Sequence, residues 1–311
     1  MQLISFTTQE TDWRVPRVGI LLNGYRLICD RLFDAGDQPA NPLAWFDIDG
    51  KWFNKARATY ERLVGDSDAQ AEAHAKGWLI ESKDAYWFAP VPRPGKVICI
   101  GLNYRDHAAE SNMPIPKEPV VFSKFATAVI APGEPVLLPS SSTQVDYEAE
   151  LAVVIGRRVK HVTAARAFEY VLGYTCFNDI SARDFQFADG QWQRGKSCDT
   201  FAPMGPTIVT ADVLTNPHNL SIKLMLNGRI MQDSNTDQLI FGVPELIEFL
   251  SRTITLEPGD IIATGTPPGV GFARKPPVFL QAGDEMIVDI ERVGKLNNPV
   301  AAIGEAISTA A

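Results

Sequence analysis

Short apolar runs that stop at a glycine or at polar residues dominate the chain from about residue 97 onward. Val97–Ile100 and Leu151–Ile155 each end directly before a glycine, a pattern typical of buried β-strands. The segment 222–226 runs into Asn227-Gly228, a pair that favours a tight hairpin turn. Further strands are predicted at 120–122, 135–138, 174–179, 261–263 and 286–290. This part of the chain is therefore predicted to be rich in β-strands.

Helical patterns are fewer. In the first part of the chain we predict a strand at 18–22 and helices around 54–63 and 66–76, and later helices at 164–171 and 243–252. Because the later strands are not separated by regular helices, a mixed β-rich roll is favoured over a doubly wound parallel sheet.

The segment 88–95, FAPVPRPG, contains three prolines in eight residues. Proline has a fixed φ and lacks an N–H donor, so such a segment suits an extended linker. We place a boundary here, between a small variable α+β domain over 1–93 and a catalytic domain over 94–311. The predicted fold class is α+β and β-rich, a mixed β-sandwich roll with a small N-terminal domain.

Composition and charge narrow the functional classes. The 311 residues include 45% hydrophobic and 21% charged residues, as in ordinary globular proteins. A net charge of -8 gives no general attraction to nucleic acids or to anionic membranes, and no apolar run is long enough to span a bilayer. The first residues lack a signal-peptide pattern, and the four scattered cysteines fit a reduced protein. We therefore expect a cytoplasmic protein without nucleic-acid or membrane partners.

Three carboxylates are candidate metal ligands. Side chains alternate along a strand, so Glu148 and Glu150 share one face of the strand that begins near residue 146. Two adjacent carboxylates repel each other unless a cation joins them, although a solvated polar face is the commoner meaning of such a pair. Asp179 ends the next apolar run. Three carboxylates suit Mg²⁺ or Mn²⁺, and no histidine has zinc-like spacing.

His107 and Glu110 lie three residues apart on a predicted short helix, where they share one side. The carboxylate could orient the imidazole as a general base. An ordinary surface pair is the alternative.

Two glycine-rich segments are candidate sites for binding anions. Segment 190–197 has the letters of a phosphate-binding loop, but it lacks the preceding buried strand and the following helix, so we reject a nucleotide site. Lys196 within it could still face a substrate carboxylate as a point charge. The backbone amides of segment 263–271 could bind an anionic oxygen, or the segment could be a simple tight turn.

The ordered motifs GLNYRDHAAE, DYEAELAVVIG, NDISARD, GKSCDTFAPMGP and GDIIATGTPPGVG together resemble the fumarylacetoacetate hydrolase superfamily over about residues 94–300. The stretch 274–284 is most similar to the branch of fumarylacetoacetate hydrolase domain-containing proteins 2, which neighbours bacterial oxaloacetate decarboxylases. The resemblance implies a β-roll core, a homodimer and Mg²⁺ or Mn²⁺ on Glu148, Glu150 and Asp179.

The same resemblance implies a catalytic dyad of His107 and Glu110, assisted by Lys196. It also leads us to expect substrate contacts from five further residues. These are Arg105, Lys124, Gln186, Thr200 and Thr266.

The leading functional hypothesis is a divalent-metal-dependent hydrolase or lyase acting on a small anionic 2-keto acid. It would cleave a C–C bond of an acylpyruvate- or oxaloacetate-like β-keto or β-diketo acid through a metal-stabilised enolate. The alternative is an isomerase, a keto–enol tautomerase acting on oxaloacetate or on an unsaturated 2-hydroxy dicarboxylate. A second alternative is an inactive homologue that binds metal and ligand.

Overall fold

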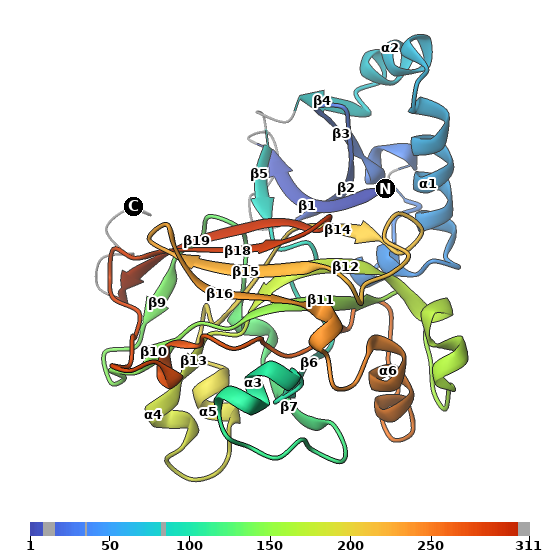
Figure 1. Ribbon diagram of the computed structural model, residues 1–311. Helices are drawn as coiled ribbons and strands as arrows, with labels where there is room; N and C mark the ends of the chain where they lie inside the picture. Colours follow the sequence, from blue (N-terminus) through green and yellow to red (C-terminus); the bar gives the residue numbers. More distant parts are fainter. Residues whose placement is uncertain (9–15, 35, 82–84, 304–311) are drawn as a thin grey trace.

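The computed structural model describes residues 1–8, 16–34, 36–81 and 85–303 (Figure 1). Strands outnumber helices and form mixed sheets, which confirms the predicted α+β class. In the described part of the chain, no helix combines the length and the apolar character needed to cross a membrane. All four cysteines are free thiols.

The larger sheet has twelve strands and extends from the upper part of the molecule to its lower part in Figure 1. Its main path is, in spatial order, β4 (Leu79–Glu81), β3 (Tyr25–Ile28), β2 (Arg17–Leu22), β1 (Gln2–Thr8), β14 (Ala202–Thr210), β12 (Val171–Asn178), β11 (Ala149–Ile155), β17 (Ile261–Ala263), β6 (Val97–Gly101) and β7 (Val120–Lys124). Two further strands join its side, β5 (Ala85–Phe88) on β1 and β8 (Val129–Ile130) on β14.

A second sheet of five strands packs against the centre of the first. Its order is β16 (Arg229–Asn235), β15 (Ser221–Leu226), β18 (Glu285–Ile290), β19 (Gly294–Ala302) and β9 (Val136–Leu138). The predicted hairpin is confirmed at β15–β16, where Asn227 (φ 51°) and Gly228 (φ 75°) both have positive φ, as a two-residue primed turn requires.

Strand β11 is buried on both faces. Leu151 and Val153 belong to the core between the two sheets, whereas Ala152 and Val154 pack into a second core beneath the N-terminal segment. This explains the continuous apolar run in the sequence, since both sets of alternate residues are removed from water. The start of this strand is consequently held rigidly, and that is where the acidic residues lie.

The N-terminal residues add strands to the same large sheet, because β1 pairs with β14 with Leu3 opposite Ile208. Helices α1 (Lys51–Leu63) and α2 (Ser67–Ala75) confirm the two helices predicted there. They lie along one side of this upper part of the molecule (Figure 1). The division of the chain at residue 93 stays a prediction.

Besides the short helix that carries His107 and Glu110, two helices were predicted in the second part of the chain. The one at 243–252 is confirmed as α6 (Val243–Ser251). The segment predicted as a helix at 164–171 is instead a 3₁₀ helix, η5 (Ala164–Tyr170). It leads directly into β12 at Val171, and short 3₁₀ turns are common in such connectors.

Candidate active site

The three predicted carboxylates come together. Glu148, Glu150 and Asp179 are buried, and each offers an oxygen within 4.8 Å of the others. The register of β11 and β12 causes this, because Ala149 lies opposite Asn178 and the amide of Asp179 donates to the carbonyl of Glu148 at 2.9 Å. Alternation along β11 then brings Glu150 to the same face as Glu148. We refer to these three residues as the acidic triad.

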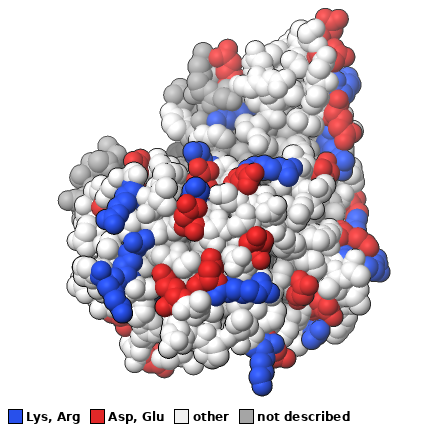
Figure 2. All heavy atoms as spheres, in the orientation of Figure 1, with Lys and Arg blue, Asp and Glu red and all other residues white. Residues whose placement is uncertain are grey.

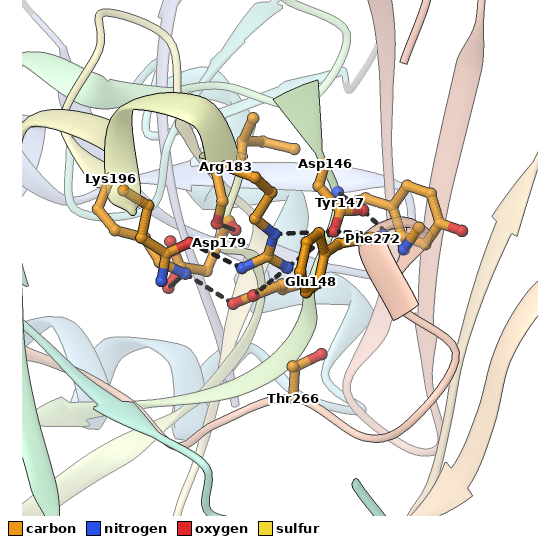
Figure 3. A network of polar contacts seen from close by, with 12 residues as sticks. Asp146, Tyr147, Glu148, Asp179, Arg183, Lys196, Thr266 and Phe272 are labelled. Carbon is orange, nitrogen blue, oxygen red and sulfur yellow. Dashed lines mark hydrogen bonds and ion pairs between the residues drawn. The ribbon is translucent and has the colours of Figure 1, made fainter. Parts of the chain in front are cut away.

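Buried cations surround this triad (Figure 3). The Lys196 ammonium lies 2.8 Å from Glu148 and 2.9 Å from Asp179. Lys124 pairs with the other oxygen of Asp179 and donates to the carbonyl of Ile180 at 2.9 Å. Arg183 lies 2.6 Å from Glu148 and 2.8 Å from Asp146. Charged groups this deeply buried must be paired to be tolerated.

With all groups ionised, as when a metal ion takes the place of a proton on Glu150, the cluster carries one more negative than positive charge. Four buried carboxylates, Asp146 and the triad, face the three cations Lys124, Arg183 and Lys196. Among the residues that the structure describes, no ion pair reaches Glu150. Its carboxylate accepts one backbone hydrogen bond, from Gly265 at 2.9 Å.

The pKa values of Glu148 and Glu150 shift in opposite directions in this environment. Burial raises the pKa of Glu150 well above its usual range, and repulsion from Asp179 and Glu148 adds to the effect. Burial also disfavours the charged form of Glu148, but Lys196 and Arg183 outweigh it and lower the pKa of Glu148 to about 2. A buried, all-oxygen donor set with excess negative charge is the environment that Mg²⁺ or Mn²⁺ prefers, so these residues fit a divalent cation.

His107 and Glu110 contact each other at one end of α3 (Arg105–Glu110). His107 Nδ1 lies 3.2 Å from a carboxylate oxygen of Glu110. The Gly269 amide donates to both Glu110 oxygens, at 3.0 and 3.1 Å. Burial opposes ionisation of Glu110, but the hydrogen bonds from His107 and Gly269 hold its pKa below the usual value. A charged Glu110 keeps the proton on Nδ1 and leaves Nε2 as the basic nitrogen.

The glycine-rich loop after β17 binds the carboxylates of the protein itself. Backbone amides of Gly265, Gly269 and Gly271 donate to Glu150, Glu110 and Asp146, the last at 2.7 Å. The backbone amides of segment 263–271 therefore bind carboxylate oxygens, and those oxygens belong to side chains of the protein. Gly269 has φ +99°, and a Cβ there would lie 2.1 Å from the carbonyl oxygen of Met231, so only glycine fits this position.

A cavity of about 560 Å³ joins the dyad to the acidic triad. His107 and Glu110 line one part of it, and Glu148 and Glu150 line another. The remaining wall is largely apolar and is formed by Ile100, Leu102, Met113, Phe122, Phe187, Trp192, Val270 and Phe272. A mainly apolar hollow with a few converging polar groups is the usual form of a small-molecule site.

The five predicted substrate contacts divide into two groups. Gln186 and Thr266 line the cavity. Arg105 instead donates to the carbonyl of Leu239, Thr200 accepts from the amide of Leu137 at 2.8 Å, and Lys124 is turned to Asp179. None of these three is among the residues that line this cavity, and each polar end is bound to the protein itself.

Arg183 and Asp146 were missed in the sequence. Asp146 follows the same alternation as Glu148 and Glu150, which was the available signal. Arg183 lies in the NDISARD motif just beyond Asp179, but its pairing with a distant strand depends on tertiary structure. Segment 190–197 follows the short helix α4 (Arg183–Gln186) and contains only α5 (Gln193–Lys196), in agreement with the rejection of a nucleotide loop.

Charged side chains on the outside do not form a comparable cluster in the view of Figure 2. Lys and Arg side chains lie interspersed with Asp and Glu side chains over this face. This face therefore offers no extended field of a single sign.

Residues 96–301 match the family model described as fumarylacetoacetate (FAA) hydrolase C-terminal. The chain belongs to the fumarylacetoacetate hydrolase family. It is 50% identical over 306 residues to a mitochondrial oxaloacetate tautomerase of Xenopus laevis, covering 96% of this chain and 90% of that protein. It is 51% identical over 224 residues to one of Bos taurus, covering 71% of each chain.

Among solved structures, a maleylpyruvate hydrolase of Sphingobium sp. SYK-6 in complex with manganese(II) ion and pyruvate is 30% identical. The match covers 97% of this chain and 99% of that one, with a TM-score of 0.74. Because these members of the fumarylacetoacetate hydrolase family are enzymes that interconvert or cleave keto acids, this chain is an enzyme of the same family. Our expectation of a cytoplasmic protein is wrong, since the oxaloacetate tautomerases that it resembles are named as mitochondrial. The predicted homodimer stays a prediction.

Proposed function

We propose that the protein is a divalent-metal-dependent oxaloacetate tautomerase that interconverts the keto and enol forms of a small 2-keto dicarboxylate. The observation that carries the proposal is the shared cavity, in which an oriented histidine faces an acidic triad. The relative from Xenopus laevis, similar over nearly the whole chain, supports this reaction over the C–C bond cleavage that we first favoured.

In this proposal Glu148, Glu150 and Asp179 hold Mg²⁺ or Mn²⁺. When bound, such a cation acts as a Lewis acid on the carboxylate and keto oxygens of the substrate. Lys196 and Lys124 form ion pairs with Asp179 and fix its position. Arg183 does the same for Glu148.

His107 is the acid–base group. Its Nε2 removes a proton from C3 of the keto form, and a proton is added to the oxygen on C2, so that one C–H bond is exchanged for one O–H bond. Glu110 stabilises the imidazolium that exists between these two steps, and the Gly269 amide holds Glu110 in place. No water molecule is consumed, which suits a cavity with a largely apolar wall.

C–C bond hydrolysis is the second candidate, because the maleylpyruvate hydrolase structure shares the fold at 30% identity. In that reaction His107 would deprotonate a water molecule that attacks the distal carbonyl.

The test follows the ultraviolet absorbance of the oxaloacetate enol with Mg²⁺ or Mn²⁺, together with a separate measurement of pyruvate. We expect the enol signal to relax faster with the protein than in buffer alone, and no pyruvate to be released. His107→Ala should abolish the acceleration. His74→Ala, on exposed α2, is the matched control and should keep full activity. Pyruvate release at the rate of enol loss would favour the cleaving reactions. No effect of the metal-loaded protein on either signal would refute an enzymatic role with this substrate.

A further inference from the structure

Gln232, on β16, is a buried amide with every hydrogen-bonding group satisfied. It is 1% exposed. Its Oε1 accepts from the amide of Ala149 at 2.9 Å, and its Nε2 donates to the carbonyl of Pro267 and to the hydroxyl of Thr266, both at 2.8 Å. A backbone N–H can only donate and a carbonyl can only accept. These two contacts therefore fix which end of the Gln232 amide carries the protons.

This orientation determines the role of the Thr266 hydroxyl. The hydroxyl oxygen accepts a hydrogen bond from Gln232 Nε2, and the hydroxyl itself donates a hydrogen bond to the carbonyl of Ala149 at 3.0 Å. A hydroxyl has one proton and two acceptor lone pairs. The proton and one lone pair are occupied, so only one lone pair remains.

Thr266 is 6% exposed and lines the site cavity together with Glu148 and Glu150. In Figure 3 it stands apart below Glu148 and the ion-pair network. A ligand therefore meets a hydroxyl that can accept a hydrogen bond and has no proton to donate.

We propose that Gln232 is a positioning residue that makes Thr266 a hydrogen-bond acceptor towards the cavity, and that Thr266 thereby selects a ligand group that carries a donor. This inference rests on the proposed tautomerase function, because the hydroxyl of an enol is such a donor and the keto oxygen is not. A carboxylate or keto oxygen at the same point would face a lone pair and repel it.

The test uses two planar ligands, oxamate and oxalate, that differ at one position. Oxamate carries an NH₂ donor there, and oxalate carries an acceptor oxygen. Their dissociation constants are measured by calorimetry with the Mg²⁺-loaded protein, so no turnover is needed. The ratio of the two constants in each variant removes effects common to both ligands.

Thr266→Val keeps the shape and removes the hydroxyl, and we expect it to shift the ratio towards oxalate by about tenfold, the size of one hydrogen bond. Thr266→Ser keeps the hydroxyl and should leave the ratio as in the native protein. Gln232→Met removes the donor to Thr266 without introducing an acceptor. The Thr266 hydroxyl is then free to turn its proton to the ligand, so this variant should shift the ratio in the same direction as Thr266→Val.

A ratio that is unchanged in Thr266→Val, including equal weakening of both ligands, would overturn the inference. If Gln232→Met does not fold, the comparison of the valine and serine variants still decides. A shifted ratio in a protein that does not act on oxaloacetate would refute the proposed function and leave the donor selectivity standing.

Discussion

Replacing Arg183 by methionine is the most direct test of the buried charge network. The Arg183 side chain is 6% exposed and pairs with Asp146, whose side chain is fully buried, at 2.8 Å. Methionine keeps much of the volume and removes the charge. Asp146 would then retain only backbone donors, including the amides of Gly271 and Phe272.

The expected loss of stability is large. Breaking a buried ion pair from one side costs about 3–5 kcal/mol, because the remaining charge is buried without a partner. Neutralising Asp146 as well removes the part of that cost that belongs to Asp146, whereas Glu148, the second partner of Arg183, keeps its ion pair with Lys196. The double variant Arg183→Met with Asp146→Asn should therefore lose less stability than the sum of the single variants, with a coupling of at least about 1 kcal/mol.

The measurement is urea unfolding of the metal-free protein, followed by tryptophan fluorescence. Arg166→Met is the matched control, because Arg166 pairs with Glu169 at 2.8 Å on the surface, with the two side chains 62% and 47% exposed. Its effect should stay below about 1 kcal/mol. If Arg183→Met costs no more than this control, or if the two single losses simply add, the network does not stabilise the fold in the way described.

Three further predictions concern the site. Because burial and neighbouring carboxylates raise the pKa of Glu150, the native protein without metal holds a proton that the unfolded chain releases. The contribution of Glu150 to the free energy of unfolding is therefore fully present below the ordinary glutamate pKa. It is lost as the pH rises through the raised pKa of Glu150 in the folded protein. The urea midpoint of the metal-free protein should therefore fall as the pH rises above the ordinary glutamate range and through the raised pKa of Glu150. Glu150→Gln or added Mg²⁺ should flatten that slope, and an equal slope in the variant would contradict the assignment. Glu110→Gln removes the charge that supports the imidazolium, so kcat for tautomerisation should drop about 100-fold with little change in KM, and an unchanged kcat would exclude the dyad. Gly269→Ala should displace the amide that holds Glu110 and lower kcat as well as stability, whereas Gly283→Ala, with a similar φ of +92° and open space around it, should lower stability only.

The sequence predicted those parts of the fold and of the site that depend on local pattern. Alternation put Glu148 and Glu150 on one face, and the helical spacing of His107 and Glu110 predicted their contact, which the structure gives at 3.2 Å. The Asn227-Gly228 turn was equally local.

Features that depend on long-range contacts were beyond such reasoning. Arg105 was expected at the substrate, but the fold brings the carbonyl of Leu239 to its guanidinium. Nothing near Gln232 in the sequence indicates that its amide reaches Ala149 and Thr266 across the space between two sheets. The location in the cell also could not be derived from the sequence pattern. We expected a cytoplasmic protein, whereas the similar oxaloacetate tautomerases are named as mitochondrial.

The loop after β17 has a consequence for how this enzyme could diversify. Main-chain amides of its glycines donate hydrogen bonds to Glu150, Glu110 and Asp146. These hydrogen bonds do not depend on any side chain of the loop. Val270 and Phe272, which alternate with these glycines, face the ligand cavity instead. Mutation can thus reshape the ligand surface at Val270 and Phe272 while the donors to the carboxylates stay in place. This separation makes the loop a natural starting point for evolving the enzyme, in the laboratory or in nature, towards other keto acids.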